Sequence, residues 1–110
     1  MEQKERVMQF LVIARDGGDA DALKRRLAVR EQHIALSNEA IKRGEQLLGA
    51  AMLNEDGAMK GSVMIVDFPD RATLDAWLRV EPYVTGKVWQ DIEIIPCRIG
   101  PSFESLFAKN

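Results

Sequence analysis

The single histidine of the chain lies in a row of polar side chains at helical spacing. The row consists of Arg26, Arg30, His33 and Ser37, which are four, three and four residues apart and therefore share one side of a helix. An imidazole exchanges protons near neutral pH, and a guanidinium binds carboxylates and phosphates. The row therefore predicts either an anion-binding cleft with a general acid–base, or a solvated helix flank whose arginines keep their charges in water.

A carboxylate beside His33 would fix the tautomer of its ring and improve it as an acid–base catalyst. Three acids in predicted turns are candidates, and their spacing does not choose among them: Glu55, Asp56 and Glu81. Ser62, at the start of a predicted strand, has a hydroxyl that could donate a hydrogen bond into the same space. Tyr83 follows Glu81 by two residues, so we place it at the same cleft.

The elements that must position these side chains alternate between strand and helix patterns. The hydrophobic pattern and turn residues predict strand, helix, strand, strand, helix, strand at about 7–14, 20–43, 45–53, 61–68, 70–81 and 87–95. The first strand is apolar at nearly every position, which is typical of a central strand. In the first helix, the stripe expected to pack on the sheet consists of Leu23, Leu27, Ile34 and Ile41.

The order βαββαβ is that of the ferredoxin-like fold, an α+β architecture in which two helices cover one face of a four-stranded antiparallel sheet. The other face remains open and receives apolar side chains from the first strand. Because such a patch is unusual on a soluble monomer, we expect a symmetric homodimer through the open sheet face. The C-terminal Phe103, Leu106 and Phe107 are expected either to contact the partner subunit or to cover their own sheet edge.

Composition excludes several classes of protein. A length of 110 residues with 46% hydrophobic and 29% charged residues predicts one domain over 1–110, with a core at about 7–97 and a tail at 98–110. Fifteen basic and seventeen acidic residues are interspersed, which is not the pattern of a nucleic-acid-binding protein. The chain has no apolar run of the roughly 20 residues that a membrane span needs and no apolar signal core, so we expect no membrane partner and a cytoplasmic location.

Cysteine and glycine usage gives no sign of a bound metal or cofactor. Cys97 is the only cysteine, so neither an internal disulfide nor the paired ligands of a structural zinc site can be formed. Gly17 and Gly18 do not build a phosphate-binding or dinucleotide-binding loop. We therefore expect a protein without metal or cofactor.

Several short segments, taken in order, resemble the YciI-like (YCII-related) family of small proteins. They are residues 27–33 (LAVREQH), 44–50 (GEQLLGA), 61–62 (GS), 76–77 (AW), 81–84 (EPYV) and the closing strand up to Pro96, and they span roughly residues 7–97. The family is related to the dimeric α/β barrel proteins, which include small-molecule isomerases and enzymes of aromatic degradation. The resemblance therefore implies the ferredoxin-like fold and a homodimer.

The resemblance also implies a site, in which a helix histidine meets the acid of a D-P-Y-V motif, near an arginine and a strand serine. The matching residues of this chain are His33, Glu81, Arg30 and Ser62. Two departures are Glu81, where the family usually has aspartate, and the pair Ala51 and Met52, where a Gly-Pro is common.

These observations predict a cofactor-independent enzyme of the isomerase or lyase type. In this hypothesis His33, oriented by Glu81, is the general acid–base, and Arg30, Ser62 and Tyr83 bind a small anionic cyclic or aromatic substrate. Two alternatives remain open. One is a non-catalytic ligand-binding or accessory module, and the other is a dimerisation protein whose polar row is a satisfied structural network.

Overall fold

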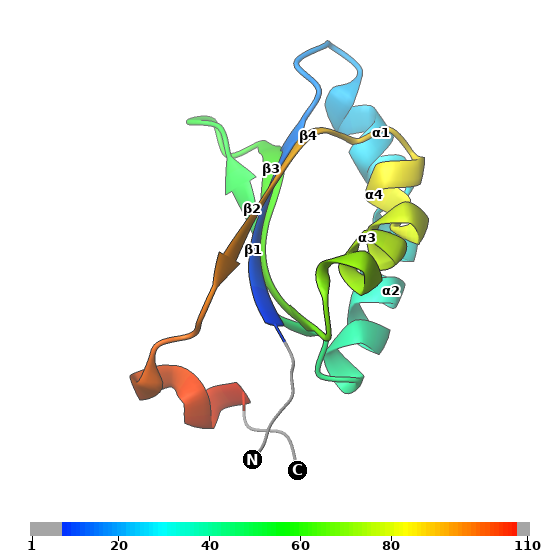
Figure 1. Ribbon diagram of the computed structural model, residues 1–110. Helices are drawn as coiled ribbons and strands as arrows, with labels where there is room; N and C mark the ends of the chain where they lie inside the picture. The colour runs from blue at the N-terminus through cyan, green and yellow to red at the C-terminus, as the bar shows by residue number, and fades with distance from the viewer. Residues whose placement is uncertain (1–7, 108–110) are drawn as a thin grey trace.

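Residues 8–107 are described by the computed structural model, and they form an antiparallel sheet with helices along one face (Figure 1). The strands are β1 (Met8–Asp16), β2 (Gln46–Leu53), β3 (Met59–Phe68) and β4 (Trp89–Cys97), in the order β2–β3–β1–β4. The helices are α1 (Ala22–Ala28), α2 (Arg30–Lys42), α3 (Arg71–Val80), α4 (Pro82–Thr85) and the 3-10 helix η1 (Pro101–Phe107). The predicted ferredoxin-like α+β fold is confirmed, while the predictions for Val7 and for tail residues 108–110 lie outside the described residues.

β1 is the centre of the sheet because it pairs with β3 on one side and β4 on the other. Its alternate residues Phe10, Val12 and Ala14 are buried beneath the helices. Leu11 and Ile13 between them point to the opposite face and are half-buried. The nearly continuous apolar run of the sequence therefore serves two faces of the sheet, as a central strand requires.

The first predicted helix is divided at Val29, whose φ of −117° and ψ of 12° interrupt the helical backbone between α1 and α2. The prediction that the large aliphatic stripe packs on the sheet is wrong. Its members remain well exposed: Leu23 37%, Leu27 54%, Ile34 38% and Ile41 55%. The buried side chains are Ala22, Arg26 and Ala40, each one position earlier than a stripe residue, which corresponds to a rotation of about 100°. Small and polar side chains therefore face the sheet here, and they leave space between α2 and β3.

The junction of α3 and α4 is defined by a cap at each helix. Asp70 begins α3, since its side chain accepts a 2.8 Å hydrogen bond from the backbone N–H of Thr73. α3 ends at Glu81 because Pro82 disfavours the helical conformation in the residue before it. Pro82 then begins the short helix α4, which the sequence did not predict. The sharp change of direction places Glu81 in the interior, where it is 0% exposed.

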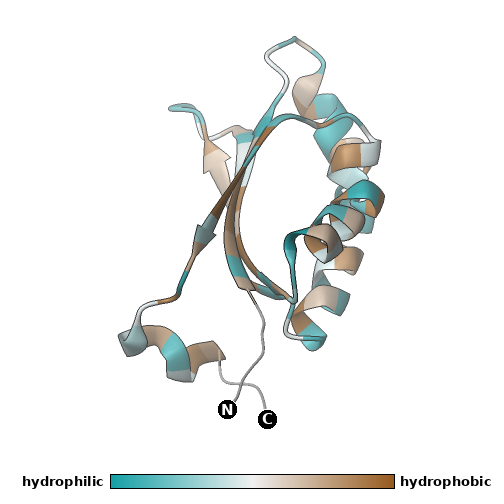
Figure 2. Ribbon diagram, viewed as in Figure 1, coloured by the Kyte–Doolittle hydropathy of each residue, from teal (hydrophilic) through white to brown (hydrophobic). Residues whose placement is uncertain are grey.

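The face of the sheet opposite the helices is covered by no helix within residues 8–107 (Figure 1), and Figure 2 shows that the strands consist largely of hydrophobic residues. Direct cross-strand pairing places Leu11 beside Ile65 and Ile95, and Leu48 beside Ile65. Leu48 is 52% exposed and Ile95 39% exposed. The strands therefore present a continuous apolar surface to solvent.

The described part of the C-terminal tail leaves most of its own apolar side chains uncovered. The backbone N–H of Ile99 donates a 2.7 Å hydrogen bond to the side-chain oxygen of Gln9, which ties the start of the tail to β1. In η1, Phe103 is 56% exposed and Leu106 is 70% exposed.

Within residues 8–107, none of the helices has the length and apolar character needed to cross a membrane.

Candidate functional site

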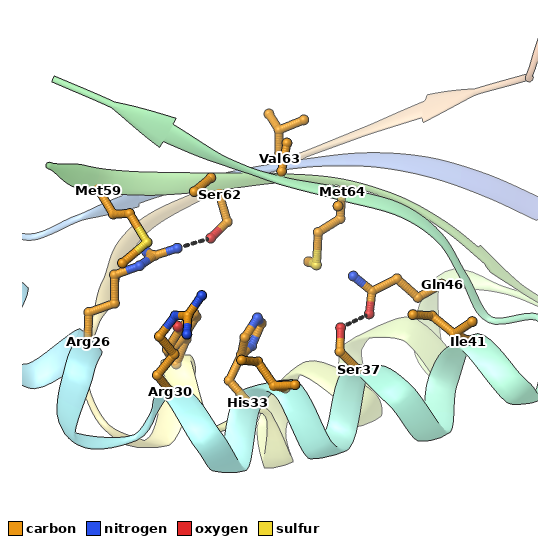
Figure 3. Close-up of a pocket in the computed structure, with 15 residues that line it drawn as sticks. Arg26, Arg30, His33, Ser37, Ile41, Gln46, Met59, Ser62, Val63 and Met64 are labelled. Atoms are coloured by element: carbon orange, nitrogen blue, oxygen red, sulfur yellow. Dashed lines mark hydrogen bonds between the residues drawn. The ribbon is translucent and has the colours of Figure 1, made fainter. Parts of the chain in front are cut away.

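A cavity of about 250 Å³ lies between α2 and the sheet (Figure 3). Arg30, His33 and Ser37 extend from α2 toward the sheet, and Ser62 and Met64 face them from β3. The whole polar row that the sequence singled out lines this cavity: Arg26, Arg30, His33 and Ser37. The row therefore borders a cleft, where Arg26 is buried, His33 and Ser37 are half-buried and Arg30 is exposed.

His33 contacts one of the three acids that the sequence left open. Its Nδ1 lies 3.0 Å from both carboxylate oxygens of Glu81. The Glu81 side chain is fully buried, and the His33 side chain is 16% exposed. A carboxylate that is ionised only accepts hydrogen bonds, so beside an ionised Glu81 the hydrogen is on Nδ1 and Nε2 is the nitrogen available to a ligand.

The position of the Glu81 carboxylate is set by the local backbone. Its Oε1 also accepts a 2.8 Å hydrogen bond from the backbone N–H of Tyr83, as the N-cap of α4. A buried carboxylate needs hydrogen-bond donors to offset its lost hydration, and here an imidazole and a backbone amide supply them. The carboxylate is therefore held in place before any ligand binds.

Two aromatic rings fix the plane of the imidazole. The ring of Tyr83 stacks on that of His33, with centroids 3.8 Å apart and planes inclined by 12°. Trp89 meets the imidazole edge-on, with its centroid 6.0 Å away. Burial raises the pKa of the Tyr83 hydroxyl, while the charges of Arg26 and Arg30 act to lower it. Tyr83, predicted to lie at the cleft, thus supports His33 directly.

Arg26 forms a buried ion pair with Asp16, a role that the sequence did not assign to it. Its Nη1 lies 2.9 and 3.0 Å from the two Asp16 oxygens, and both side chains are 3% exposed. Its Nη2 donates to Ser62 Oγ at 2.8 Å, and its guanidinium lies 4.6 Å from the centre of the Tyr83 ring. Burial raises the pKa of the Asp16 carboxyl, and Arg26 opposes that shift. Arg26 is therefore a neutralised part of the cavity wall.

Arg30, which the sequence proposed for anion binding, lines the cavity and is exposed. Among the residues that the structure describes, no carboxylate forms an ion pair with it, so its charge is available to a ligand. Ser62, also predicted, accepts hydrogen bonds from Arg26 and, at 3.2 Å, from Trp89 Nε1. The five predicted site residues are thus brought to one place.

Three further residues of the site were not foreseen: Asp16, Gln46 and Trp89. The register between β1 and β4 shifts between Arg15 and Asp16, because Arg15 pairs with Asp91 and Asp16 pairs with Trp89. This shift turns the Trp89 side chain toward the helices. Regular alternation would place Trp89 and Asp91 on one face, and a register shift of this kind leaves no clear signal in the sequence. Gln46 begins β2 and accepts a hydrogen bond from the Ser37 hydroxyl.

Metal-binding groups are not gathered in the described part of the chain, where no cluster of three or more His, Cys, Asp or Glu side chains is arranged to hold an ion. Burial raises the pKa of the Cys97 thiol, which does not line the cavity. The chemistry that the arrangement offers is proton transfer at His33 beside a cation and hydrogen-bond donors.

Comparison with known proteins gives matches along most of the chain. The YCII-related domain matches residues 8–98. Protein YciI of Escherichia coli O6:H1 and that of Shigella flexneri are each 30% identical over 95 residues, covering 81% of this chain and 95% of each relative. An uncharacterised protein of Haemophilus influenzae is 30% identical over 96 residues, with the same coverage.

Solved structures share the fold at lower identity. The 5-chloro-2-hydroxyhydroquinone dehydrochlorinase of Burkholderia phenoliruptrix, in complex with 2,5-dihydroxybenzoquinone, aligns with a TM-score of 0.73 at 17% identity, covering 86% of this chain and 98% of that one. A candidate antibiotic biosynthesis monooxygenase of Bacteroides thetaiotaomicron aligns with a TM-score of 0.53 at 16% identity, covering 86% and 90%. These likenesses confirm the fold of the dimeric α/β barrel proteins.

The family match extends over most of the chain, and the relatives match along nearly their whole length. The chain therefore belongs to the YCII-related domain family.

Proposed function

We propose that this protein is a cofactor-independent enzyme that transfers a proton on a small anionic cyclic or aromatic substrate, as an isomerase or lyase does. The observation that carries the proposal is the pair formed by His33 and Glu81, with 3.0 Å between Nδ1 and the carboxylate oxygens. This contact leaves Nε2 for the substrate, and the carboxylate stabilises the imidazolium that forms when Nε2 takes a proton.

The reaction follows from the groups around His33. Nε2 removes a proton from a substrate carbon or hydroxyl, and the resulting charge is held by the Arg30 guanidinium and the Ser62 hydroxyl. The imidazolium then returns the proton to another substrate atom, which completes an isomerisation, or to a leaving group, which completes an elimination. Both outcomes restore neutral His33 without an external oxidant or reductant.

The similarly folded dehydrochlorinase supports the substrate class. That protein is named for dehydrochlorination of a chlorinated hydroxyhydroquinone, and its structure holds 2,5-dihydroxybenzoquinone. The fold thus accommodates a small oxygenated ring. The cavity of about 250 Å³ in this chain is below the range of about 300–1,000 Å³ typical of drug-sized ligands and suits one ring.

Exchange of carbon-bound substrate hydrogens with deuterated water tests the proposal without knowledge of the product. Small ring acids and hydroxyquinones are incubated with the protein, and loss of proton signals is followed by nuclear magnetic resonance. We expect exchange that falls by about 100-fold or more in His33→Ala. Lys42→Ala, on the exposed end of α2, is the matched control and should leave the rate unchanged. Undiminished exchange in His33→Ala would contradict the proposal.

A non-catalytic ligand-binding module is the second candidate. The observation in its favour is that several polar groups of the cavity are already paired with one another, as in the contacts of Arg26 with Asp16 and of Ser37 with Gln46. Saturable binding of a ring acid with no hydrogen exchange by the wild-type protein would favour this function.

We further propose that the protein is a homodimer through the open sheet face. The support is the apolar surface around Leu11, Leu48, Ile65 and Ile95, which lies on the side of the sheet away from the cavity. Figure 3 shows the two sides, with Val63 pointing away from its neighbours Ser62 and Met64. Burying this face in a partner would leave the cavity open to substrate.

The cytoplasmic location and the absence of a nucleic-acid partner stay predictions.

A further inference from the structure

Ser37 and Gln46 form a second polar pair in the cavity, at the end away from Arg30 (Figure 3). Gln46 is only 6% exposed. The Ser37 hydroxyl donates a hydrogen bond to the Gln46 amide oxygen, which fixes the orientation of the amide. Figure 3 shows the amide nitrogen turned into the cavity toward Met64.

The Gln46 amide nitrogen is positioned as a hydrogen-bond donor for a ligand. Within residues 8–107 it donates to no protein acceptor, so its hydrogens are available to an acceptor on a bound molecule. Gly49 makes room for this nitrogen, because a Cβ at that position would lie 3.0 Å from it. The amide nitrogen therefore lies close to the Gly49 backbone and faces the cavity.

The opposite end of the cavity also presents donors. The Ser62 oxygen accepts hydrogen bonds from Arg26 Nη2 at 2.8 Å and from Trp89 Nε1 at 3.2 Å. Both lone pairs of the hydroxyl are thereby used, so its hydrogen is left to donate. Together with the available charge of Arg30, this end suits an anionic oxygen.

His33 lies between the two ends, and apolar side chains line the span. His33 and Ser37 are four residues apart on α2, so their Cβ atoms are about 5–6 Å apart, which is comparable to the width of one six-membered ring. Ile34 and Met64 supply apolar contacts along this span. A flat ring placed in the cavity therefore passes His33, with hydrogen-bond donors at Arg30 and Ser62 toward one end and at Gln46 toward the other.

We infer that the substrate carries oxygen acceptors at two opposite ends of one ring, an anionic oxygen at Arg30 and Ser62 and an uncharged carbonyl-type oxygen at the Gln46 amide. This inference rests on the proposed function and adds Gln46 as a residue that determines specificity. Ser37 is a positioning residue, since it acts through the Gln46 amide.

Two probes of similar size test the inference. 4-Acetylbenzoate has a carbonyl oxygen opposite its carboxylate, and 4-isopropylbenzoate has a methyl group in the same place. Their dissociation constants are measured by calorimetry for the wild type, Gln46→Met, Gln46→Glu and Arg30→Ala, with thermal unfolding of each variant as the check on folding. One net hydrogen bond predicts a preference of about 5–10-fold for 4-acetylbenzoate in the wild type.

The variants show separately how Gln46 and Arg30, at the two ends of the cavity, contribute to binding of the probes. Gln46→Met, which keeps the length of the side chain but has no donor, should abolish the preference while 4-isopropylbenzoate binds as before. Gln46→Glu keeps the acceptor for Ser37 and replaces the donor with an acceptor, so it should disfavour 4-acetylbenzoate. Arg30→Ala should weaken both probes by a similar factor.

Equal affinity of the wild type for the two probes, or a preference that survives in Gln46→Met, would overturn the inference and leave the proposed function standing. Failure of both probes to bind would overturn the inference together with the anion-binding part of the proposed function. Hydrogen exchange dependent on His33 remains a separate measurement of the catalytic part.

Discussion

The imidazole of His33 lies flat on the phenol ring of Tyr83, with ring centroids 3.8 Å apart. Glu81, two residues before Tyr83 in the chain, contacts Nδ1 of the same imidazole through its carboxylate. The tautomer of the ring and its plane are thus both set by the junction of α3 and α4, although the ring itself belongs to α2. The proposed acid–base group is consequently oriented across a contact between two helical segments.

Glu81→Gln tests whether the carboxylate charge supports His33. We expect the variant to fold, since an amide oxygen still accepts the hydrogen bond from the Tyr83 backbone N–H. Substrate hydrogen exchange should fall by about 10²–10⁴-fold, because the imidazolium loses its counter-charge. Nuclear magnetic resonance gives the rate and circular dichroism the fold. Glu39→Gln, on the exposed side of α2, is the control, and equal rates in both variants would refute a role for the Glu81 charge.

Arg26→Met should reduce the free energy of unfolding by about 3–5 kcal/mol, because Asp16 is left as a buried carboxylate without its partner. Urea denaturation measures the change. The double variant Asp16→Asn/Arg26→Met should recover part of the loss, since neither charge is then buried alone. Arg25→Met, which removes an exposed ion pair with Asp19, should have a much smaller effect. The single variant Asp16→Asn is measured as well. If the loss of unfolding free energy in the double variant equals the sum of the losses in Asp16→Asn and Arg26→Met, this account is contradicted.

Tyr83 is the only tyrosine, so the ultraviolet absorbance of tyrosinate reports it alone. Burial raises its pKa, so ionisation in the folded protein should occur above the usual value of 10.0. Between the unfolded and folded pKa values the native state retains a proton that the unfolded state releases, so stability should fall as pH rises through that interval.

Arg30→Ala should move the pKa of Tyr83 still higher, because the Arg30 charge favours the phenolate. The same titration measures this shift, with Lys42→Ala as the control. A folded protein whose tyrosine titrates at or below the usual pKa of 10.0 would conflict with the burial described for this ring.

A glutamate in the open sheet face should separate the proposed dimer. Ile65→Glu places a charge at the centre of the apolar face, where a partner subunit would have to bury it. Sedimentation should give the wild type at twice the 12.4 kDa of one chain and the variant at the single mass. Val80→Glu introduces the same charge on the exposed side of α3 and should leave the mass unchanged. A wild-type protein that sediments as a single chain at micromolar concentration would disprove the dimer.

The order of the elements was predictable because strand and helix impose different periods on the sequence. The helix caps were also readable, since Asp70 begins α3 and Pro82 ends it through local sterics. The polar row on the first helix was identified by spacing alone, and it lines the cavity. Local rules therefore predicted the order of the elements and the polar row, whereas only the family resemblance singled out Glu81 as the partner of His33.

Side-chain partners were less predictable, because they depend on packing between distant elements. The pattern of large aliphatic residues indicated the wrong buried face of α1 and α2, since Ala22 and Ala40 carry little hydrophobic signal yet face the sheet. The burial of Arg26 was not predicted because its partner Asp16 was not recognised. The sequence around Asp16 is typical of a turn, whereas in the structure Asp16 is the last residue of β1 and pairs with Arg26. Gln46 was missed because one glutamine at a strand start has no motif.

Glu81 ends α3, begins α4 and contacts the imidazole with one carboxylate. A substitution at this position therefore affects the junction of α3 and α4 and the proposed reaction at the same time, so the two cannot change independently. Laboratory selection for thermostability alone would retain an acceptor there even in a protein that had lost every substrate.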